Sequence, residues 1–250
     1  MIAQDFHIHT SYCDGKNTPE EMIQAAIKLN MQKIGLVCHS YTYFDESYCI
    51  KKDKIQQFIS EVRQQSEKYK DKIEVLCGVE QDYYSAEPTS DFDYVIGSVH
   101  YVKVGDKFLD VDNTERQFVS QVNDYFNGDY IAFCREYFKT VANVVEKTGC
   151  DIIGHFDLCT KFNEGDKWFD TNDQRYISAA YDAIDSLIKY NKPFEINTGA
   201  MSRGDRSEPY PEKRFIHYIL QNGGKVILSS DSHSADALCF CFDKYEGFVL

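Results

Sequence analysis

The sequence predicts an α/β protein in which seven parallel strands form a distorted TIM-like barrel, (β/α)7. Short apolar runs alternate with helical patterns along the 250 residues. The runs are continuously apolar, as in parallel strands covered by helices on both faces. Each run also ends in a polar or metal-binding side chain. In a barrel the carboxyl ends of all parallel strands surround one opening, whereas in an open sheet they lie along a line. Because the polar residues at these ends could gather around one opening only in a barrel, we expect a closed or nearly closed barrel.

The seven predicted strands are residues 2–8, 33–39, 73–80, 93–100, 151–157, 193–199 and 225–233. After the first strand a helix is expected, because Thr18 can cap it, Pro19 suits its first position and Glu21 completes a capping box. After the second strand, apolar residues at helical spacing predict another helix. Its apolar face is formed by Ile55, Phe58, Ile59 and Val62.

Three further helices are expected between the later strands. The first follows a longer insertion, stops at Gly149 and carries Cys134, Tyr137, Phe138, Val141, Val144 and Val145 on one side. The second repeats Ile177, Ala180, Tyr181, Ile184 and Leu187. The third carries Phe215, Ile216, Ile219 and Leu220 and ends at Gly223 and Gly224. No linker or repeat divides this pattern, so residues 1–250 are expected to form a single domain.

The composition excludes several classes of partner. The 27 basic and 40 acidic residues give a formal charge of -13, which opposes binding to nucleic acid. No window approaches the ~20 apolar residues that span a bilayer, and the start MIAQDFH lacks the basic region of a signal peptide. Nine cysteines are scattered without a CxxC pair. We therefore expect a cytoplasmic protein with reduced thiols and no membrane partner; the sequence is silent on oligomeric state.

Six of the seven histidines lie at or just beyond predicted strand ends. A single histidine in that place is usually structural, but six of seven are hard to assign to chance. His7 and His9 are two residues apart, so both side chains leave the same face of a strand and can converge on one ion. His217 lies inside a predicted helix, where a packing or surface role is expected.

Three acidic residues complete a predicted ligand set. Asp231 and His233 have the same spacing of two at the seventh strand, and a lone Glu80 carboxylate inside a barrel would be costly without a cation. Asp14 could be a metal ligand, or it could simply be part of an Asp-Gly turn. The set is His7, His9, Asp14, His39, Glu80, His100, His155, Asp231 and His233. At three to four protein ligands per ion, it supports two to three divalent metal ions.

The ligand types narrow the metal only to zinc, manganese or iron. A structural zinc site is the alternative, but such sites depend on cysteine thiolates and no cysteine falls in this set. Three divalent ions would give an acidic protein the local positive charge that a phosphate needs.

Two loops are expected to bind substrate. MSRGDRSEPYP, after the sixth strand, places Arg203 and Arg206 at the barrel mouth, where a guanidinium fork suits phosphate oxygens. Arg203 is favoured because it is nearer the strand end; both arginines could instead be solvated. In YTYFDESY, Asp45 and Glu46 could meet a cationic substrate group or form a solvated loop.

These motifs resemble the polymerase and histidinol phosphatase (PHP) superfamily. Within it, the chain is similar to the monofunctional, HisJ-type histidinol-phosphatases along nearly its whole length. The resemblance is carried by DFHIHTSYCDG, CHSYTYFDESYC, GVEQDYY, IGSVHYV, IIGHFDL, EINTGAMSRG and ILSSDSH. It implies a distorted seven-stranded barrel of PHP type with a trinuclear metal site at the carboxyl ends of the strands.

The resemblance also implies a ligand set for each ion. The first ion would be held by His7, His9, Glu80 and Asp231. The second would be held by Glu80, His100 and His155, and the third by Asp14, His39 and His233.

The implied activity is hydrolysis of L-histidinol phosphate to L-histidinol and phosphate, a step of histidine biosynthesis. Metal-activated water would attack phosphorus, and we expect Asp231, His233 and Arg203 to be the catalytic residues. His233 is a candidate acid for the leaving alkoxide. One alternative is a PHP-type phosphoesterase acting on nucleotides or another small phosphate ester. Another is a metal-binding or regulatory domain that has lost catalysis. Such a domain would be expected to have lost a ligand, whereas every ligand position is filled in this sequence.

Overall fold

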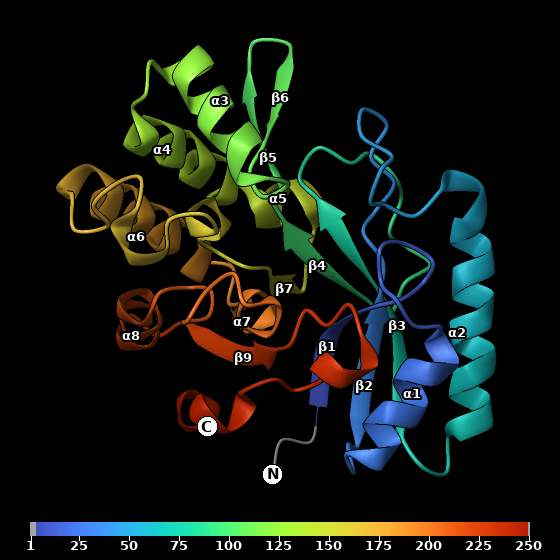
Figure 1. Cartoon of the computed structure of the whole chain (residues 1–250). Helices are drawn as coiled ribbons and strands as arrows, with labels where there is room; N and C mark the ends of the chain where they lie inside the picture. The colour runs from blue at the N-terminus through green and yellow to red at the C-terminus, as the bar shows by residue number, and fades with distance from the viewer. Residues whose placement is uncertain (1–3, 250) are drawn as a thin grey trace.

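The computed structural model describes residues 4–249, in which seven strands form one curled, parallel sheet (Figure 1). In spatial order the strands are β1 (Gln4–His9), β2 (Lys33–Val37), β3 (Glu74–Asp82), β4 (Tyr94–Ser98), β7 (Ile152–Ile153), β8 (Pro193–Asn197) and β9 (Lys225–Ser229). These seven strands correspond to the seven predicted runs, although Ile2 and Ala3 of the first run lie outside the described residues. The α/β class and the parallel sheet are confirmed.

The first and last strands of the sheet are connected by hydrogen bonds between β1 and the residues just after β9. The backbone N–H of His9 donates to the carbonyl of Ser232 over 2.8 Å, and the N–H of Ser232 donates to the carbonyl of His7 over 3.2 Å. This parallel bridge brings β1 and β9 together, so the sheet curls into a barrel-like shape. As a result, the carboxyl ends of the strands surround one mouth.

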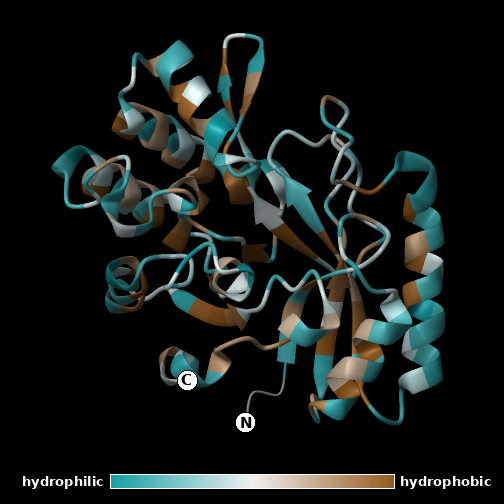
Figure 2. Ribbon diagram, in the orientation of Figure 1, coloured by the Kyte–Doolittle hydropathy of each residue, from teal (hydrophilic) through white to brown (hydrophobic). Residues whose placement is uncertain are grey.

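Helices cover the outside of this sheet (Figure 1). They are α1 (Pro19–Lys28), α2 (Ile55–Tyr69), α3 (Glu115–Phe126), α4 (Tyr130–Val141), α5 (Val144–Thr148), α6 (Gln174–Ile188), α7 (Gly199–Arg203) and α8 (Lys213–Gln221). The capping box predicted for α1 is present: the Thr18 hydroxyl accepts from the Glu21 N–H, and the Glu21 carboxylate accepts from the Thr18 N–H. Apolar residues of the helices face the sheet (Figure 2).

The predicted helix over residues 134–149 is wrong in one respect, because it is broken into α4 and α5. The Asn143 side-chain amide donates to the carbonyl of Lys139 over 2.8 Å, and Asn143 itself has φ −109° and ψ 6°. An asparagine that bonds to the local backbone in this way competes with the regular helical hydrogen bonds. The C-terminal end at Gly149, in the left-handed conformation, is as predicted.

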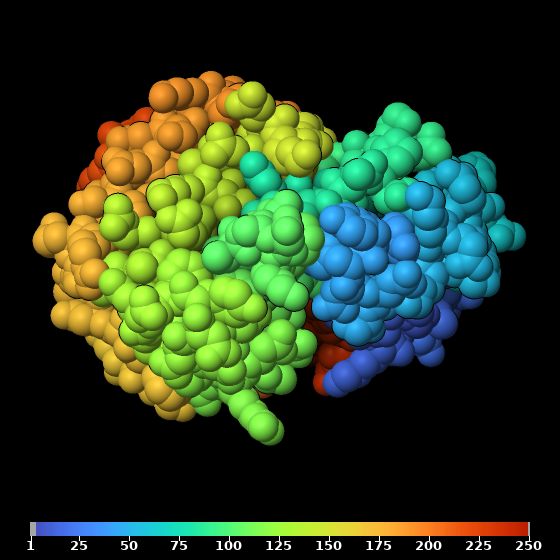
Figure 3. Space-filling view, turned by 90° about the horizontal axis from the view of Figure 1, so that it is seen from above, coloured from blue at the N-terminus to red at the C-terminus, as the bar shows by residue number. Residues whose placement is uncertain are grey.

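The insertion after β4 contains an antiparallel hairpin of β5 (Tyr101–Val104) and β6 (Lys107–Asp110), followed by α3. The hairpin packs against the loop after β2, where the rings of Phe44 and Phe108 stack with centroids 3.8 Å apart. Figure 3 shows these two segments, in green and blue, side by side on one face of the molecule. The sequence pattern predicted neither the hairpin nor α3.

No helix in the described part of the chain is both long and apolar enough to cross a membrane.

Candidate metal centre and active site

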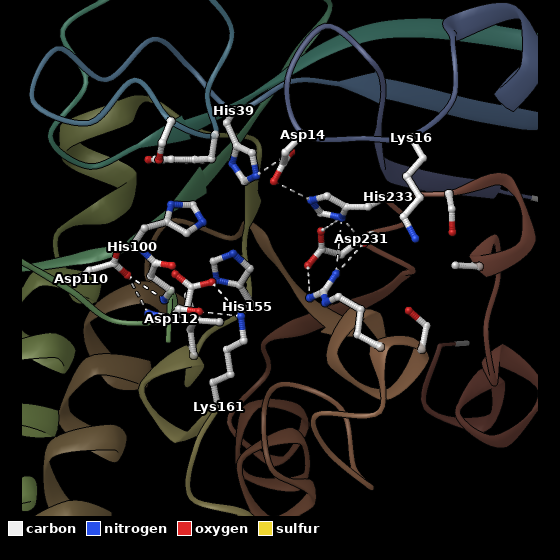
Figure 4. Close-up of a pocket in the computed structure, with 18 of the residues that line it drawn as sticks. Asp14, Lys16, His39, His100, Asp110, Asp112, His155, Lys161, Asp231 and His233 are labelled. Carbon is white, nitrogen blue, oxygen red and sulfur yellow. Dashed lines mark hydrogen bonds and ion pairs between the residues drawn. The ribbon is translucent and has the colours of Figure 1, made fainter. Parts of the chain in front are cut away.

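A cavity of about 720 Å³ opens at the carboxyl ends of the strands. Side chains from separate strand ends point into it, among them His39, His100, His155 and His233 (Figure 4). His7 and His9 lie beneath, at the end of β1, and are fully buried. All nine predicted metal ligands lie at this one place.

Glu80 of β3 lies at the centre of the cluster and is buried. Its Oε2 atom is 3.4 Å from the Nε2 atoms of both His7 and His9. Its Oε1 atom is 3.0 Å from Nε2 of His155 and 3.4 Å from Nε2 of His100. The Glu80 carboxylate therefore lies between the two histidines of β1 and the histidines that follow β4 and β7.

Asp231 closes the cluster on the side of β9. Its Oδ1 atom is 3.4 Å from Nε2 of His9 and 3.7 Å from Nε2 of His7. The compact group formed by His7, His9 and Glu80 is therefore flanked by a second carboxylate.

Asp14 forms a second group with three histidines. Its carboxylate is 3.3 Å from Nε2 of His233, 3.6 Å from Nε2 of His39 and 3.9 Å from Nδ1 of His9. The turn that carries Asp14 depends on Gly15, where a Cβ atom would lie 2.6 Å from the Thr10 nitrogen. His39 also reaches the first group, because its Nδ1 atom lies 2.7 Å from Oε2 of Glu80.

The donor atoms fit divalent cations. Glu80 Oε2 and His39 Nδ1 are buried and have no hydrogen-bond partner among the described residues, despite their short separation. The Nε2 atoms of His7 and His9 face each other 3.1 Å apart. Buried polar atoms without partners are costly, whereas converging nitrogen and carboxylate atoms are ordinary ligands of zinc and similar ions.

The electrostatics of the cavity also favour cations. Six aspartates and three basic side chains line it, a formal charge of −3 with neutral histidines. Burial alone would raise the pKa of Glu80, but the surrounding His39, His7 and His100 hold it well below its usual range. The pKa of His7 is raised well above its usual value, because the Glu195, Glu80 and Asp231 carboxylates outweigh burial.

Two carboxylates behind the ligands were not in the predicted set. Glu195 of β8 is fully buried; its Oε1 atom lies 2.7 Å from Nδ1 of His7, and its Oε2 atom accepts from the His155 N–H over 3.1 Å. Asp82 Oδ2 lies 3.2 Å from Nδ1 of His100. Such carboxylates fix the orientation of ligating imidazoles. The signal for Glu195 was an acid inside the apolar run PFEIN.

Arg203, at the end of α7, lies at the cavity as expected. Its guanidinium donates to the carbonyl oxygen of Asp231 over 3.2 Å and lies 3.5 Å from the Asp231 carboxylate. The same group is 3.4 Å from Nδ1 of His233. Arg203, Asp231 and His233, the three predicted catalytic residues, are therefore mutual neighbours.

Arg206 and Glu46 are not among the residues that line the cavity, so their contact with substrate stays a prediction. The Arg206 guanidinium donates to the carbonyl and hydroxyl oxygens of Thr160, each over 2.7 Å. Glu46 is exposed and is bound by Lys51 and Tyr41. The adjacent Asp45 lines the cavity instead, as do Lys161 and Asp112.

Comparison with curated proteins finds two similar chains. One is a probable histidinol-phosphatase of Deinococcus radiodurans, 27% identical over 249 residues, which cover 95% of this chain and 89% of the relative. The other is a probable histidinol-phosphatase of Schizosaccharomyces pombe, 26% identical over 233 residues, with 86% and 74% covered.

Comparison with solved structures finds the same fold. A putative histidinol phosphatase from Listeria monocytogenes has a TM-score of 0.84 at 20% identity, covering 97% of this chain and 99% of that one. Histidinol phosphate phosphatase from Lactococcus lactis, solved with zinc, L-histidinol and phosphate, has a TM-score of 0.73 at 22% identity, covering 99% and 92%. The PHP domain model matches residues 5–199, which is most of the chain. The chain belongs to the PHP domain family.

Proposed function

We propose that the chain is a metal-dependent phosphomonoesterase whose substrate is L-histidinol phosphate. The observation that carries this proposal is the convergence of six histidines and three carboxylates at one cavity, with Arg203 beside them. The cavity lining is negative, so a phosphate dianion could enter only after cations are bound.

Two to three divalent ions, of zinc, manganese or iron, would bind there. We assign His7, His9, Glu80 and Asp231 to the first, Glu80, His100 and His155 to the second, and Asp14, His39 and His233 to the third. When bound, such ions lower the pKa of water and neutralise charge on a phosphoryl group. The distances around Glu80 and around Asp14 support three overlapping groups of candidate ligands, which are His7, His9 and Glu80, then His39, Glu80 and His100, and then His9, Asp14, His39 and His233.

The side chains of this protein would then orient the ester and its leaving group. The Arg203 guanidinium, held by Asp231, is placed to bind phosphoryl oxygens and to stabilise their charge in the transition state. His233 is 21% exposed at its side chain and lies beside Arg203. When only the first two ions are bound, His233 is our candidate for the proton donor to the leaving alkoxide, because a metal-bound imidazole nitrogen carries no proton.

Histidinol phosphate is favoured by the names of the two curated relatives and by the Lactococcus lactis complex. The cavity supports it chemically, because Asp110 and Asp112 lie on the side away from Asp231 (Figure 4) and Asp45 also lines the cavity. These carboxylates would attract the cationic ammonium and imidazole of histidinol. Product formation would serve histidine biosynthesis.

We further propose that residues 1–250 act as one PHP-type barrel domain, since seven strands, β1 to β4 and β7 to β9, share a single curled sheet. A cytoplasmic location is supported by the nine cysteines, all of which are free thiols.

The test is phosphate release from histidinol phosphate, nucleoside monophosphates and an aryl phosphate. We expect the kcat/KM for histidinol phosphate to be at least about tenfold the others. Metal analysis of the purified chain should give two or more ions. A preference for a nucleotide would support the alternative of another PHP-type phosphoesterase, and turnover of no ester would leave a metal-binding domain.

A further inference from the structure

Two cysteines lie next to the candidate ligands but are not among them. Cys13 directly precedes Asp14, and Cys38 directly precedes His39. Cys13 lies in the turn after β1 and is half-buried, whereas Cys38 follows β2 and is 2% exposed. The parallel pairing of His9 with Val37 brings the ends of β1 and β2 together, and with them both cysteines.

The two thiols meet at Thr10. The Cys13 thiol donates to the Thr10 carbonyl over 3.5 Å, and Cys38 Sγ lies 3.6 Å from the Thr10 hydroxyl. The two thiols are also close enough for each to shift the pKa of the other. In addition, Cys13 Sγ is 3.5 Å from Nδ1 of His9. The thiol of the half-buried Cys13 is therefore placed between a buried thiol and a candidate ligand.

We propose that Cys13 and Cys38 form a redox switch, in which a peroxide converts them to a disulfide and disables the Asp14 metal group. The Cys13 sulfur attacks one oxygen of hydrogen peroxide, giving a sulfenic acid and one water. The Cys38 sulfur then attacks the Cys13 sulfur and releases a second water. Two thiols lose two electrons and two protons, and the peroxide is reduced to two waters.

Access to the oxidant separates this pair from the other close pair of cysteines. Cys134 and Cys159 also interact through their thiols, but they are 0% and 1% exposed within the main core. Cys13 is half-buried in a turn, whereas Cys134 and Cys159 have almost no exposed area, so a peroxide in solution should reach Cys13 first. Oxidation of the folded chain should therefore begin at Cys13.

The disulfide changes the geometry of the metal group because its S–S bond is only about 2.05 Å long. Cys38 is fixed at the end of a sheet strand, so the turn at residues 11–14 must move toward it. This movement breaks the contact between Cys13 and His9 and shifts Asp14 away from His39 and His233. The metal group that contains Asp14 should lose its ion, and a dithiol should reverse the change.

The experiment uses the full chain, reduced and loaded with zinc, then treated with hydrogen peroxide and quenched with catalase. We expect a Cys13–Cys38 linked peptide in a non-reducing mass map and loss of about one zinc per chain. Phosphatase activity should fall at least about tenfold. Dithiothreitol with added zinc should restore both.

Three variants separate this switch from general oxidation. Cys38→Ser keeps a small polar group beside Thr10, so it should retain basal activity and zinc and resist peroxide; Cys38→Ala provides the same test without a new hydroxyl. Cys241→Ser, at a half-buried cysteine away from the metal group, should be inactivated like the wild type. The proposal is overturned if no linked peptide forms or if both Cys38 variants are inactivated as fast as the wild type.

This inference rests on the proposed metal site, but its main readouts do not depend on the substrate. The linked peptide and the zinc count remain decisive even if histidinol phosphate is not hydrolysed. Failure of the proposed activity and failure of the switch are therefore distinguishable.

Discussion

The Nδ1 atom of His7 lies 2.7 Å from the Oε1 atom of Glu195, and both side chains are fully buried. This contact turns the His7 ring so that Nε2 faces Glu80 and Asp231. The other Glu195 oxygen accepts from the His155 N–H, so one carboxylate orders two candidate ligands. The arrangement corresponds to the carboxylate–histidine–metal relay of many metal sites.

Glu195→Gln should weaken zinc binding by about 10- to 100-fold, because a neutral amide no longer holds the His7 imidazole in its ligating orientation. Zinc affinity is measured by competition with a chelator, and the fold is checked by circular dichroism. Glu74→Gln, at an exposed acid paired with Lys33 on the same sheet, is the matched control. Equal zinc affinity in the wild type and Glu195→Gln would show that Glu195 does not position His7 for metal binding.

His9→Ala should lower kcat by at least about 1000-fold while the protein stays folded. His9 joins the Glu80 and Asp14 groups, so its loss removes a donor from both; metal ions supply several kcal/mol of transition-state stabilisation. Steady-state phosphate release is the measurement. His217→Ala is the control, because His217 is exposed on α8 and packs on Phe248. Near-normal turnover by His9→Ala would contradict its assignment as a ligand.

Asp14→Asn should reduce the metal content by about one ion per chain and leave the group around Glu80 loaded. The reason is that Asp14 supplies the only carboxylate of the group it forms with His9, His39 and His233. Elemental analysis after dialysis against dilute zinc gives the count. Asp236→Asn, at another aspartate of the cavity lining, should keep the full count. An unchanged count in Asp14→Asn would show that Asp14 serves only the turn.

The sequence predicted the strands and the place of the ligands because both follow local rules. Continuous apolar runs specify buried parallel strands, and a polar residue at the end of each run must lie at the common mouth. The two-residue spacing of His7 and His9 fixes their shared face. The strand-end positions of the candidate ligands could therefore be predicted without knowledge of tertiary contacts, whereas Asp14, which lies in a turn, also needed the resemblance to the family.

The remaining features depend on contacts between distant segments. Glu195 becomes a partner of His7 only when β8 curls toward β1, a separation of 188 residues. The β5–β6 hairpin is held by the stacking of Phe108 on Phe44, which no periodicity reveals. Periodicity also does not set the direction of loop side chains, which is why Asp45 lines the cavity and Glu46 does not.

Arg203→Ala should weaken competitive inhibition by inorganic phosphate by about 10- to 100-fold, since charged hydrogen bonds to phosphate contribute about 1.5–3 kcal/mol. Arg206→Ala should leave phosphate inhibition unchanged and lower the free energy of unfolding instead, because Arg206 donates two hydrogen bonds to Thr160. Inhibition constants and denaturant unfolding measure the two effects. If the two variants exchange these effects, Arg206 and not Arg203 is the phosphate ligand.

The contribution of Asp110 to the stability of the metal-free protein should fall as the pH rises from about 4 to about 6. Burial, with a further contribution from the neighbouring Asp112, raises the pKa of this carboxyl from 3.8 to about 6. Between these values the unfolded chain releases the proton while the folded chain keeps it, so the free energy of unfolding falls with pH. A two-unit shift corresponds to at most about 3 kcal/mol, and the loss is complete above the folded-state pKa.

Asp110→Asn isolates this contribution. The amide oxygen can still accept the backbone N–H groups of Asp112 and Asn113, which Asp110 binds over 3.0 and 2.9 Å, but the side chain no longer titrates. In the presence of a chelator, the stability of Asp110→Asn relative to the wild type should increase from pH 4 to pH 6 and then level off. Asp106→Asn, at an exposed aspartate of the same hairpin, should follow the wild type. A constant difference between Asp110→Asn and wild type across this range would show that the Asp110 pKa is not raised by folding.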